Sequence, residues 1–185
     1  MSFGVKNTLN AKADWKEGVE LNLYFATELI SLMESLETKI PPPMLMAFFI
    51  FCMWLADQYF PGYVLDETVR LFVVIGLASF GVLSSVMGVV SFVKAKTTTN
   101  PMQPEKAGTL VTTGIYQYTR NPMYLGLYCV LLAWGVFLAN GFALALALSF
   151  VPVMNFLQII PEERAMELNF REHYTAYKAK VRRWF

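Results

Sequence analysis

Charged and metal-binding side chains are scarce in this sequence. Asp, Glu, Lys and Arg make up 16% of its 185 residues, whereas an ordinary soluble domain has about 25%. The single histidine, His173, lies in a charged stretch, which excludes a histidine-rich metal centre. The two cysteines, Cys52 and Cys129, fall inside apolar segments and define neither a disulfide framework nor a metal site. Because 56% of the residues are hydrophobic, the composition is typical of a membrane protein.

Motifs for several common chemistries are also missing. The sequence has no GxGxxG after a strand, no P-loop, no HExxH and no serine or cysteine nucleophile motif. It has no internal repeat and no low-complexity tract. We therefore expect neither a metal nor a nucleic acid among its partners.

Uncharged runs predict where the chain crosses a bilayer. The segment between Arg70 and Lys94 carries no charge, and a spanning helix needs about 20 such residues. A weaker span runs from about residue 44 to residue 60, with Asp57 near its far end, where water or headgroups reach it.

A second uncharged run predicts a helical hairpin. Residues 121–161 carry no charge at all, and this length is roughly twice that of one crossing. The Asn140-Gly141 pair is the natural break, so one helix is expected near 123–139 and its partner near 142–160. With the two earlier spans, the sequence predicts an all-α, polytopic transmembrane protein with about four spans.

Basic residues predict the orientation of these spans. The connection between the first two spans, DQYFPGYVLDET, has no Lys or Arg, whereas basic residues cluster in the loop before the hairpin and in the tail after it. The positive-inside rule places both basic segments in the cytoplasm. We expect a bacterial-type inner-membrane protein with both termini cytoplasmic.

The chain divides into three regions by composition. Residues 1–43 are polar and mixed, with apolar residues at helical spacing, which fits either an interfacial helix or a leader. Residues 44–94 hold the first two transmembrane helices. Residues 95–185 hold a long polar loop, the hairpin and an amphipathic cytoplasmic tail helix whose apolar side chains can face the membrane surface or the loop.

The hairpin should bring two polar segments together, because a helical hairpin sets its two ends side by side. Pro122 biases the residue before it away from helical geometry and starts the next helix. Backbone polar groups of the preceding loop then stay free to face a ligand. The side chains expected to meet there are Arg120, Asn121, Tyr124, Glu162 and Glu163.

The motifs of these two segments resemble a known enzyme family. The pattern LVTTGIYQYTRNPMYLG, an apolar hairpin, and then EERAMELNFREHYTAYKAKVRRW is similar to the integral-membrane methyltransferases that include isoprenylcysteine carboxyl methyltransferase and phosphatidylethanolamine N-methyltransferase. The similarity covers about residues 95–185. It implies that S-adenosylmethionine is the methyl donor and that the acceptor is lipophilic.

The resemblance also implies roles for individual positions. In the prenylcysteine enzymes, an arginine four residues before the first glutamate of the pair contacts the substrate; here Gln158 stands at that place, and we expect it to contact the acceptor. The positions that the resemblance assigns to the methyl-donor pocket are Thr109, Leu110, Val111, Tyr116, Asn121, Pro122, Met123, Tyr124 and Glu162.

The residue types suit the chemistry of this donor. Arg120 can donate two parallel hydrogen bonds to the α-carboxylate of S-adenosylmethionine. Tyr116 and Tyr124 offer aromatic faces, and Glu162 offers an acceptor for the α-ammonium or the ribose hydroxyls. An amine acceptor would need a base, either Glu163 or Glu162, whereas a carboxylate acceptor would need none. The residues that we expect to be catalytic are Arg120, Glu163 and Gln158.

The sequence thus predicts an S-adenosylmethionine-dependent integral-membrane methyltransferase. Its acceptor is expected to be an isoprenylcysteine carboxylate-like molecule or a phospholipid amine. The alternative is a non-catalytic membrane protein that binds lipid or serves in assembly, with its basic tail holding anionic lipid.

Overall fold

The computed structural model describes residues 23–25, 27–28, 31, 35–95 and 108–185, and it divides into two units, Met1–Leu36 and Glu37–Phe185. In the first unit, residues 23–25 and 27–28 are helical, and the Thr27 hydroxyl donates to the Leu23 and Tyr24 carbonyls at 3.0 and 2.8 Å. Residues 1–22, 26, 29–30 and 32–34, which include much of the predicted amphipathic segment, and residues 96–107 of the predicted loop lie outside the described residues.

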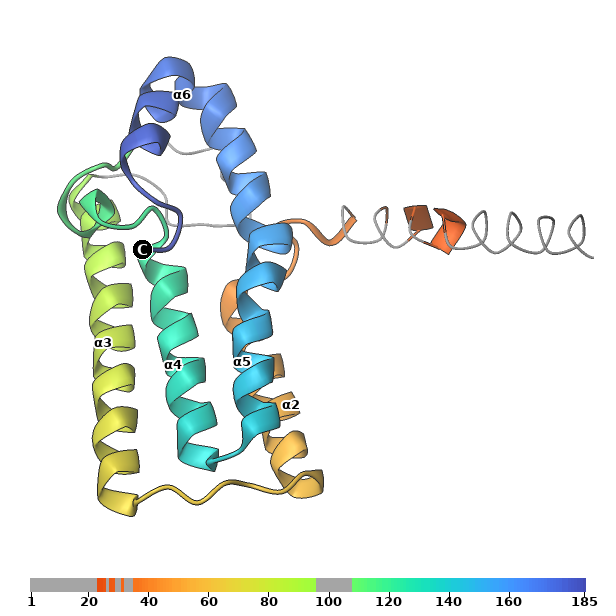
Figure 1. Cartoon of the computed structure of the whole chain (residues 1–185). Helices are drawn as coiled ribbons and strands as arrows, with labels where there is room; N and C mark the ends of the chain where they lie inside the picture. Colours follow the sequence, from red (N-terminus) through yellow and green to blue (C-terminus); the bar gives the residue numbers. More distant parts are fainter. Residues whose placement is uncertain (1–22, 26, 29–30, 32–34, 96–107) are drawn as a thin grey trace, which may run out of the picture. The chain divides into compact units, whose positions relative to one another are not determined.

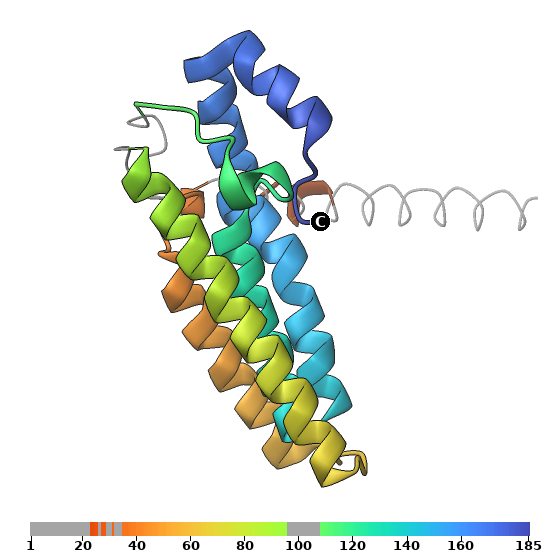
Figure 2. The same ribbon diagram turned by 90° about the vertical axis from the view of Figure 1, so that its left-hand side faces the viewer.

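The second unit is a bundle of helices that are mostly long and apolar. Four helices run side by side, and a fifth continues from the last of them beyond one end of the bundle (Figures 1 and 2). The described residues contain no strand, so the all-α prediction is confirmed. The helices are α2 (Pro42–Tyr59), α3 (Glu67–Lys94), α4 (Pro122–Leu138), α5 (Gly141–Met154) and α6 (Ile160–Lys180).

Two helical stretches of the described chain are long and apolar enough to cross a membrane. They are Glu67–Lys94 and the continuous stretch Gly141–Lys180, while α4 is apolar but shorter. Much of α3 is apolar and yet open to the surroundings: Phe72 is 74% exposed and Val93 is 66% exposed. Such a surface is unfavourable in water and suits contact with lipid tails.

Small residues let α3 and α4 approach closely. An added Cβ on Gly81 would lie 2.7 Å from the carbonyl oxygen of Gly126. Ser84 and Ser85 donate hydroxyl bonds to the carbonyls of Pro122 and Met123, at 2.8 and 3.2 Å. Glycine and serine at four-residue spacing thus serve helix packing, as is common in membranes.

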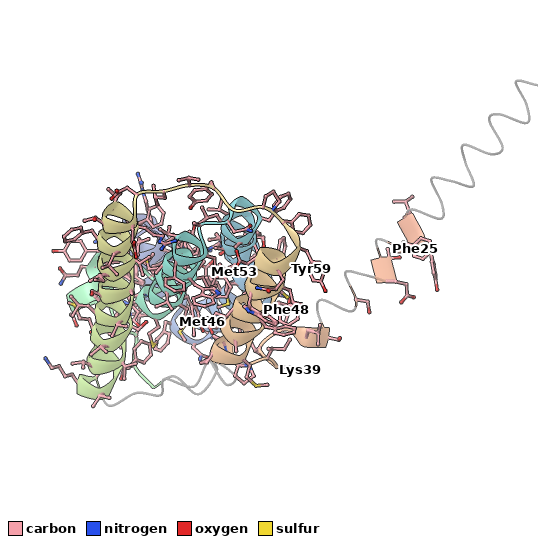
Figure 3. All side chains as sticks on the ribbon, turned by 90° about the horizontal axis from the view of Figure 1, so that it is seen from below. Phe25, Lys39, Met46, Phe48, Met53 and Tyr59 are labelled. Carbon is pink, nitrogen blue, oxygen red and sulfur yellow. The ribbon has the colours of Figure 1, made fainter. Side chains whose placement is uncertain are left out.

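The remaining helices pack through larger side chains. Met53 of α2 is fully buried and points toward the neighbouring helices, whereas Phe48 of the same helix is 61% exposed on the outside (Figure 3). The ring of Phe49 meets that of Phe150 on α5 edge to face, with centroids 5.3 Å apart. An added Cβ on Gly135 of α4 would lie 3.3 Å from the Met53 methyl, so α2 contacts α4 as well.

The predicted break of the hairpin is confirmed at Asn140. Its side-chain oxygen accepts hydrogen bonds from the backbone nitrogens of Phe142 and Ala143, at 2.9 and 3.1 Å, and so caps α5. Its side-chain nitrogen donates to the Phe60 carbonyl at 3.0 Å, which ties the hairpin to the end of α2. The Asn140 side chain is fully buried, and its bond to the Ala143 nitrogen is shielded from water.

We expect Asn140→Ala to lower the free energy of unfolding by about 2 kcal/mol, because it removes the cap and leaves the Phe60 carbonyl without its donor. The matched control is Asp66→Ala, which removes the exposed cap of α3, a single bond of 3.0 Å to the Val69 nitrogen. Its cost should be smaller, about 1 kcal/mol or less. Thermal unfolding in detergent measures both, and equal losses would contradict the prediction.

The helix that follows α5 changes geometry twice before it ends. A π-helical turn, Asn155–Ile159, joins α5 to α6. Inside α6, Arg171 has φ 45° and ψ −120°, and the chain turns back at that point (Figure 1). The returning half packs Tyr174, Tyr177 and Val181 into a small cluster, against which Leu110, Met166 and Phe170 lie.

Candidate functional site

A cavity lies where the segment before α4 meets the start of α6. Its wall includes the 3-10 turn η2 (Gly114–Gln117), the first turn of α4 and both halves of α6. Of the side chains predicted for the site, all except Pro122 and Gln158 line this cavity. The lining residues are Phe92, Thr109, Leu110, Val111, Tyr116, Arg120, Asn121, Met123, Tyr124, Ile159, Glu162, Glu163, Met166, Tyr174 and Tyr177.

The first turn of α4 is shaped by its proline. Pro122 is the first residue of the helix, and Asn121 before it has the non-helical angles φ −131° and ψ 56°. The Asn121 backbone nitrogen therefore bonds outside the helix, to the Thr119 hydroxyl at 3.2 Å. Pro122 itself is buried against α3, where its carbonyl accepts the Ser84 bond. Its role is to start the helix and fix the loop, without facing the cavity.

Tyr124 and Glu162 meet across the cavity, although 38 residues separate them in the chain. The Tyr124 hydroxyl donates a hydrogen bond to Oε1 of Glu162. One residue comes from the first turn of α4 and the other from the first turn of α6. The predicted juxtaposition of the two polar segments by the hairpin is therefore present.

Arg120 and Glu163 form a buried ion pair beside them. Nη2 of Arg120 lies 2.8 Å from Oε1 of Glu163, and the two side chains are only 8% and 9% exposed. Within the part of the chain that the structure describes, Nε and Nη1 of Arg120 are buried and have no hydrogen-bond partner. An arginine held in this way has two donors left for a ligand in the cavity that it lines.

Glu163, one of the two predicted candidates for a base, has three cationic neighbours. Besides Arg120, the guanidinium of Arg183 binds it through two bonds of 2.8 and 3.0 Å, and Nζ of Lys178 lies 3.9 Å away. Glu163 is thus the anion on which these three cations converge.

Tyrosines from η2 and the returning half of α6 form a further wall. The hydroxyl of Tyr177 donates to the backbone oxygen of Tyr116 at 2.7 Å. The Tyr116 ring in turn meets that of Phe92 on α3, with centroids 5.3 Å apart. Burial raises the pKa of both Tyr116 and Tyr177 well above the ordinary value, so both hydroxyls stay protonated at neutral pH.

Gln158 lies elsewhere than the sequence-based interpretation expected. It is fully buried in the π turn, and its side-chain nitrogen donates to the Ile40 carbonyl at 2.6 Å. One residue earlier, the Leu157 carbonyl accepts a bond of 2.8 Å from the Thr38 nitrogen. Gln158 thus anchors the segment before α2 to the π turn, and it is not among the residues that line the cavity.

The carboxyl group of Glu162 is held mostly in its protonated form at neutral pH. Burial raises its pKa from the ordinary 4.5 to about 8, and the nearby charge of Glu163 acts in the same direction, while the Tyr124 hydrogen bond opposes them. The uncharged run of the helix ends at Pro161, so this group lies outside the apolar stretch. It titrates in a range where small changes in its surroundings alter its charge.

We expect the wild-type protein to lose stability relative to Glu162→Gln as the pH rises from about 5 to about 8, and the difference to level off above that. The folded state retains the proton to a higher pH than the unfolded state, so raising the pH through this window favours unfolding. Glutamine has no such proton to lose. Thermal unfolding in detergent across this pH range measures the difference, with the exposed Glu167→Gln as the control that should follow the wild type. A parallel course for wild type and Glu162→Gln would contradict the prediction.

A match to a known protein family includes most of the elements that form the site. Residues 69–173 match a family described as phospholipid methyltransferase. A Haemophilus influenzae protein described as uncharacterized is 45% identical over 62 residues, which are 34% of this chain and 98% of that protein. No solved structure matches the chain significantly. The family match runs from the first turn of α3 to the returning half of α6, and it therefore includes Arg120, Tyr124, Glu162 and Glu163.

Proposed function

Because the chain belongs to the phospholipid methyltransferase family, we propose that it is an integral-membrane enzyme that transfers a methyl group from S-adenosylmethionine to a lipophilic acceptor. The family implies methyltransferase activity. The observation that carries the identity of the donor is the pair of unpartnered Arg120 nitrogens beside Glu162 and Tyr124 in one cavity.

The cavity offers a partner of the right kind for each part of S-adenosylmethionine. Nε and Nη1 of Arg120 suit the α-carboxylate, because each is a donor on a cation and the ligand group is an anion that accepts hydrogen bonds. Glu162 suits the α-ammonium or the ribose hydroxyls. The aromatic wall around Tyr116 suits the adenine. The loop residues that complete this donor pocket in the proposal are Thr109, Leu110, Val111, Asn121 and Met123.

When bound, S-adenosylmethionine supplies a methyl group on a positively charged sulfur, which is the electrophile of the reaction. The residues of the chain need to hold the acceptor in line with that methyl and to exclude water. Burial raises the pKa of Glu162 to about 8, and for an amine acceptor the ionised form of this group is proposed to take the proton, at Oε2. Tyr124 occupies Oε1 and orients the carboxyl group.

The acceptor is proposed to reach the site from the bilayer. In this arrangement α2, α3, α4 and α5 are four crossings, and the cavity and α6 lie at the cytoplasmic end, where the basic residues cluster. Both termini would then be cytoplasmic, in an inner membrane of the bacterial type. A phospholipid amine or an isoprenylcysteine carboxylate-like molecule could present its head to Glu162 while its chain stays in lipid.

Calorimetry in detergent with S-adenosylhomocysteine, the product of methyl transfer, tests the donor. The wild-type protein should bind it, and Glu162→Ala and Tyr124→Ala should bind it more weakly. Transfer of a labelled methyl group to vesicles of phosphatidylethanolamine, compared with a prenylated cysteine analogue, then identifies the acceptor class. Absence of binding by the wild-type protein would overturn the proposal.

A further inference from the structure

We propose that Arg183, in the segment that follows α6, is a positioning residue of the methyl-donor site. Its guanidinium holds Glu163, and Arg120 is thereby left with two N–H groups to offer to the carboxylate of the donor. The inference rests on the proposed function. It extends the site beyond the family match, which ends at residue 173.

The segment that carries Arg183 is joined to the loop before α4 through its backbone. The Arg182 carbonyl accepts a bond of 3.0 Å from the backbone nitrogen of Arg120. The Arg183 carbonyl accepts two more, from the Thr119 hydroxyl at 3.3 Å and from the Asn121 side chain at 2.9 Å. Both views show the two stretches side by side (Figures 1 and 2). The backbone of Arg183 is therefore fixed next to the site.

The following residue fixes the segment from its other side. The indole nitrogen of Trp184 donates to the side-chain oxygen of Asn155 in the π turn, at 3.0 Å. Its ring also meets that of Tyr128 on α4, with centroids 6.1 Å apart. Residues 182–184 thus connect the loop before α4, α4 itself and the π turn. The direction of the Arg183 side chain is set by contacts on both sides of it.

The side chain of Arg183 determines how many hydrogen bonds Glu163 can accept from Arg120. Nε and Nη2 of Arg183 donate to Oε1 and Oε2 of Glu163, at 3.0 and 2.8 Å, which is the bidentate arrangement. Arg120 reaches Oε1 through Nη2 alone. Because a carboxylate pairs best with one guanidinium edge, the bidentate partner of Glu163 is Arg183, and Arg120 keeps Nε and Nη1 free.

Removing Arg183 should change the pairing of Arg120. Glu163 would then be free to accept two hydrogen bonds from Arg120. This second bond would turn the remaining donors of Arg120 away from the cavity, and Glu163 would balance the charge of Arg120. The carboxylate of the donor would lose its partner. The adenosine part of the donor, which the proposal places against the aromatic wall, would keep its contacts.

The test compares two ligands that differ in the amino-acid group. S-adenosylhomocysteine carries the α-carboxylate, and 5′-methylthioadenosine lacks it. In Arg183→Leu we expect the affinity for S-adenosylhomocysteine to fall by roughly tenfold, the effect of one weakened charge-assisted contact, with the affinity for 5′-methylthioadenosine unchanged. Arg183→Lys retains the positive charge but lacks the two parallel donors of a guanidinium, and we expect it to show an intermediate loss of affinity for S-adenosylhomocysteine. Lys180→Leu removes the same charge from the exposed end of α6 and should bind both ligands as the wild type does.

Each outcome has a distinct meaning. Unchanged binding of S-adenosylhomocysteine by Arg183→Leu overturns the inference, and so does an equal loss for both ligands, which would show a structural role only. If Arg183→Leu does not fold, Arg183→Lys provides the same comparison of the two ligands. If the wild-type protein binds 5′-methylthioadenosine and S-adenosylhomocysteine equally well, the carboxylate makes no contact and the inference fails while a nucleoside site stands. If it binds neither ligand, the proposed function itself fails.

Discussion

Arg120→Leu should lower the affinity for S-adenosylhomocysteine by roughly 10- to 100-fold, because a hydrogen bond from a cation to the ligand's carboxylate, worth about 1.5–3 kcal/mol, is removed. Arg120 is the buried cation of the cavity whose Nε and Nη1 have no other partner in the described chain. Its loss leaves Glu163 still paired with Arg183, so the carboxylate does not become a buried, uncompensated charge. The effect should therefore fall on the ligand more than on stability.

The controls separate charge from geometry. Arg120→Lys keeps a positive charge but has a single donor point, and we expect it to retain part of the affinity. Binding of 5′-methylthioadenosine should change little in either variant, because that ligand has no carboxylate. Calorimetry in detergent measures each dissociation constant. An affinity of Arg120→Leu within about threefold of the wild type would contradict the assignment of this arginine to the donor, since that is well under the effect of one such bond.

Gly126→Ala should be the most damaging small substitution in the bundle. The added Cβ would collide with the carbonyl oxygen of Gly81 and with the side chain of Ser85 on α3. Because a backbone carbonyl in a helix cannot swing aside, α3 and α4 would have to move apart. Overpacking of this kind costs on the order of 3 kcal/mol. The shift would also displace Tyr124, which lies two residues earlier on the same helix.

The matched control lies on the partner helix. Gly76 of α3 has nothing within 4 Å of an added Cβ, and Gly76→Ala should be neutral or should stabilise the helix by about 0.5–1 kcal/mol. Of the two identical substitutions, only Gly126→Ala is thus expected to destabilise the protein. Unfolding temperatures in detergent, with S-adenosylhomocysteine binding as a second measurement, check both. A Gly126→Ala variant as stable as Gly76→Ala would show that α3 and α4 are not in close contact.

The main features of the bundle were predictable because they depend on local patterns. Uncharged length predicted the apolar helices, and the Asn-Gly pair predicted the break at Asn140. Pro122 predicted the start of α4, since proline at a first helical position leaves no backbone donor unpaired. Each signal is contained within a few residues of the chain.

The candidate site was predictable only in part. The proximity of Tyr124 and Glu162 could be predicted, because a hairpin of two helices of similar length sets its two ends side by side. The position of Gln158 could not, since a π turn rotates the residues that follow it, and Gln158 contacts Ile40 instead of the cavity. Arg183 was also missed, because in the sequence it is one of several basic residues in the tail.

The sequence by itself determined the class of the protein, its apolar helices and the polar segments at either end of the hairpin. These follow from composition and spacing, which act locally. The tertiary structure decided which charges meet. Glu163 binds Arg120 and Arg183 because the chain turns back at Arg171 and brings residues 181–185 to the loop before α4. Such a pairing depends on the path of the whole chain, and no local pattern of residues records it.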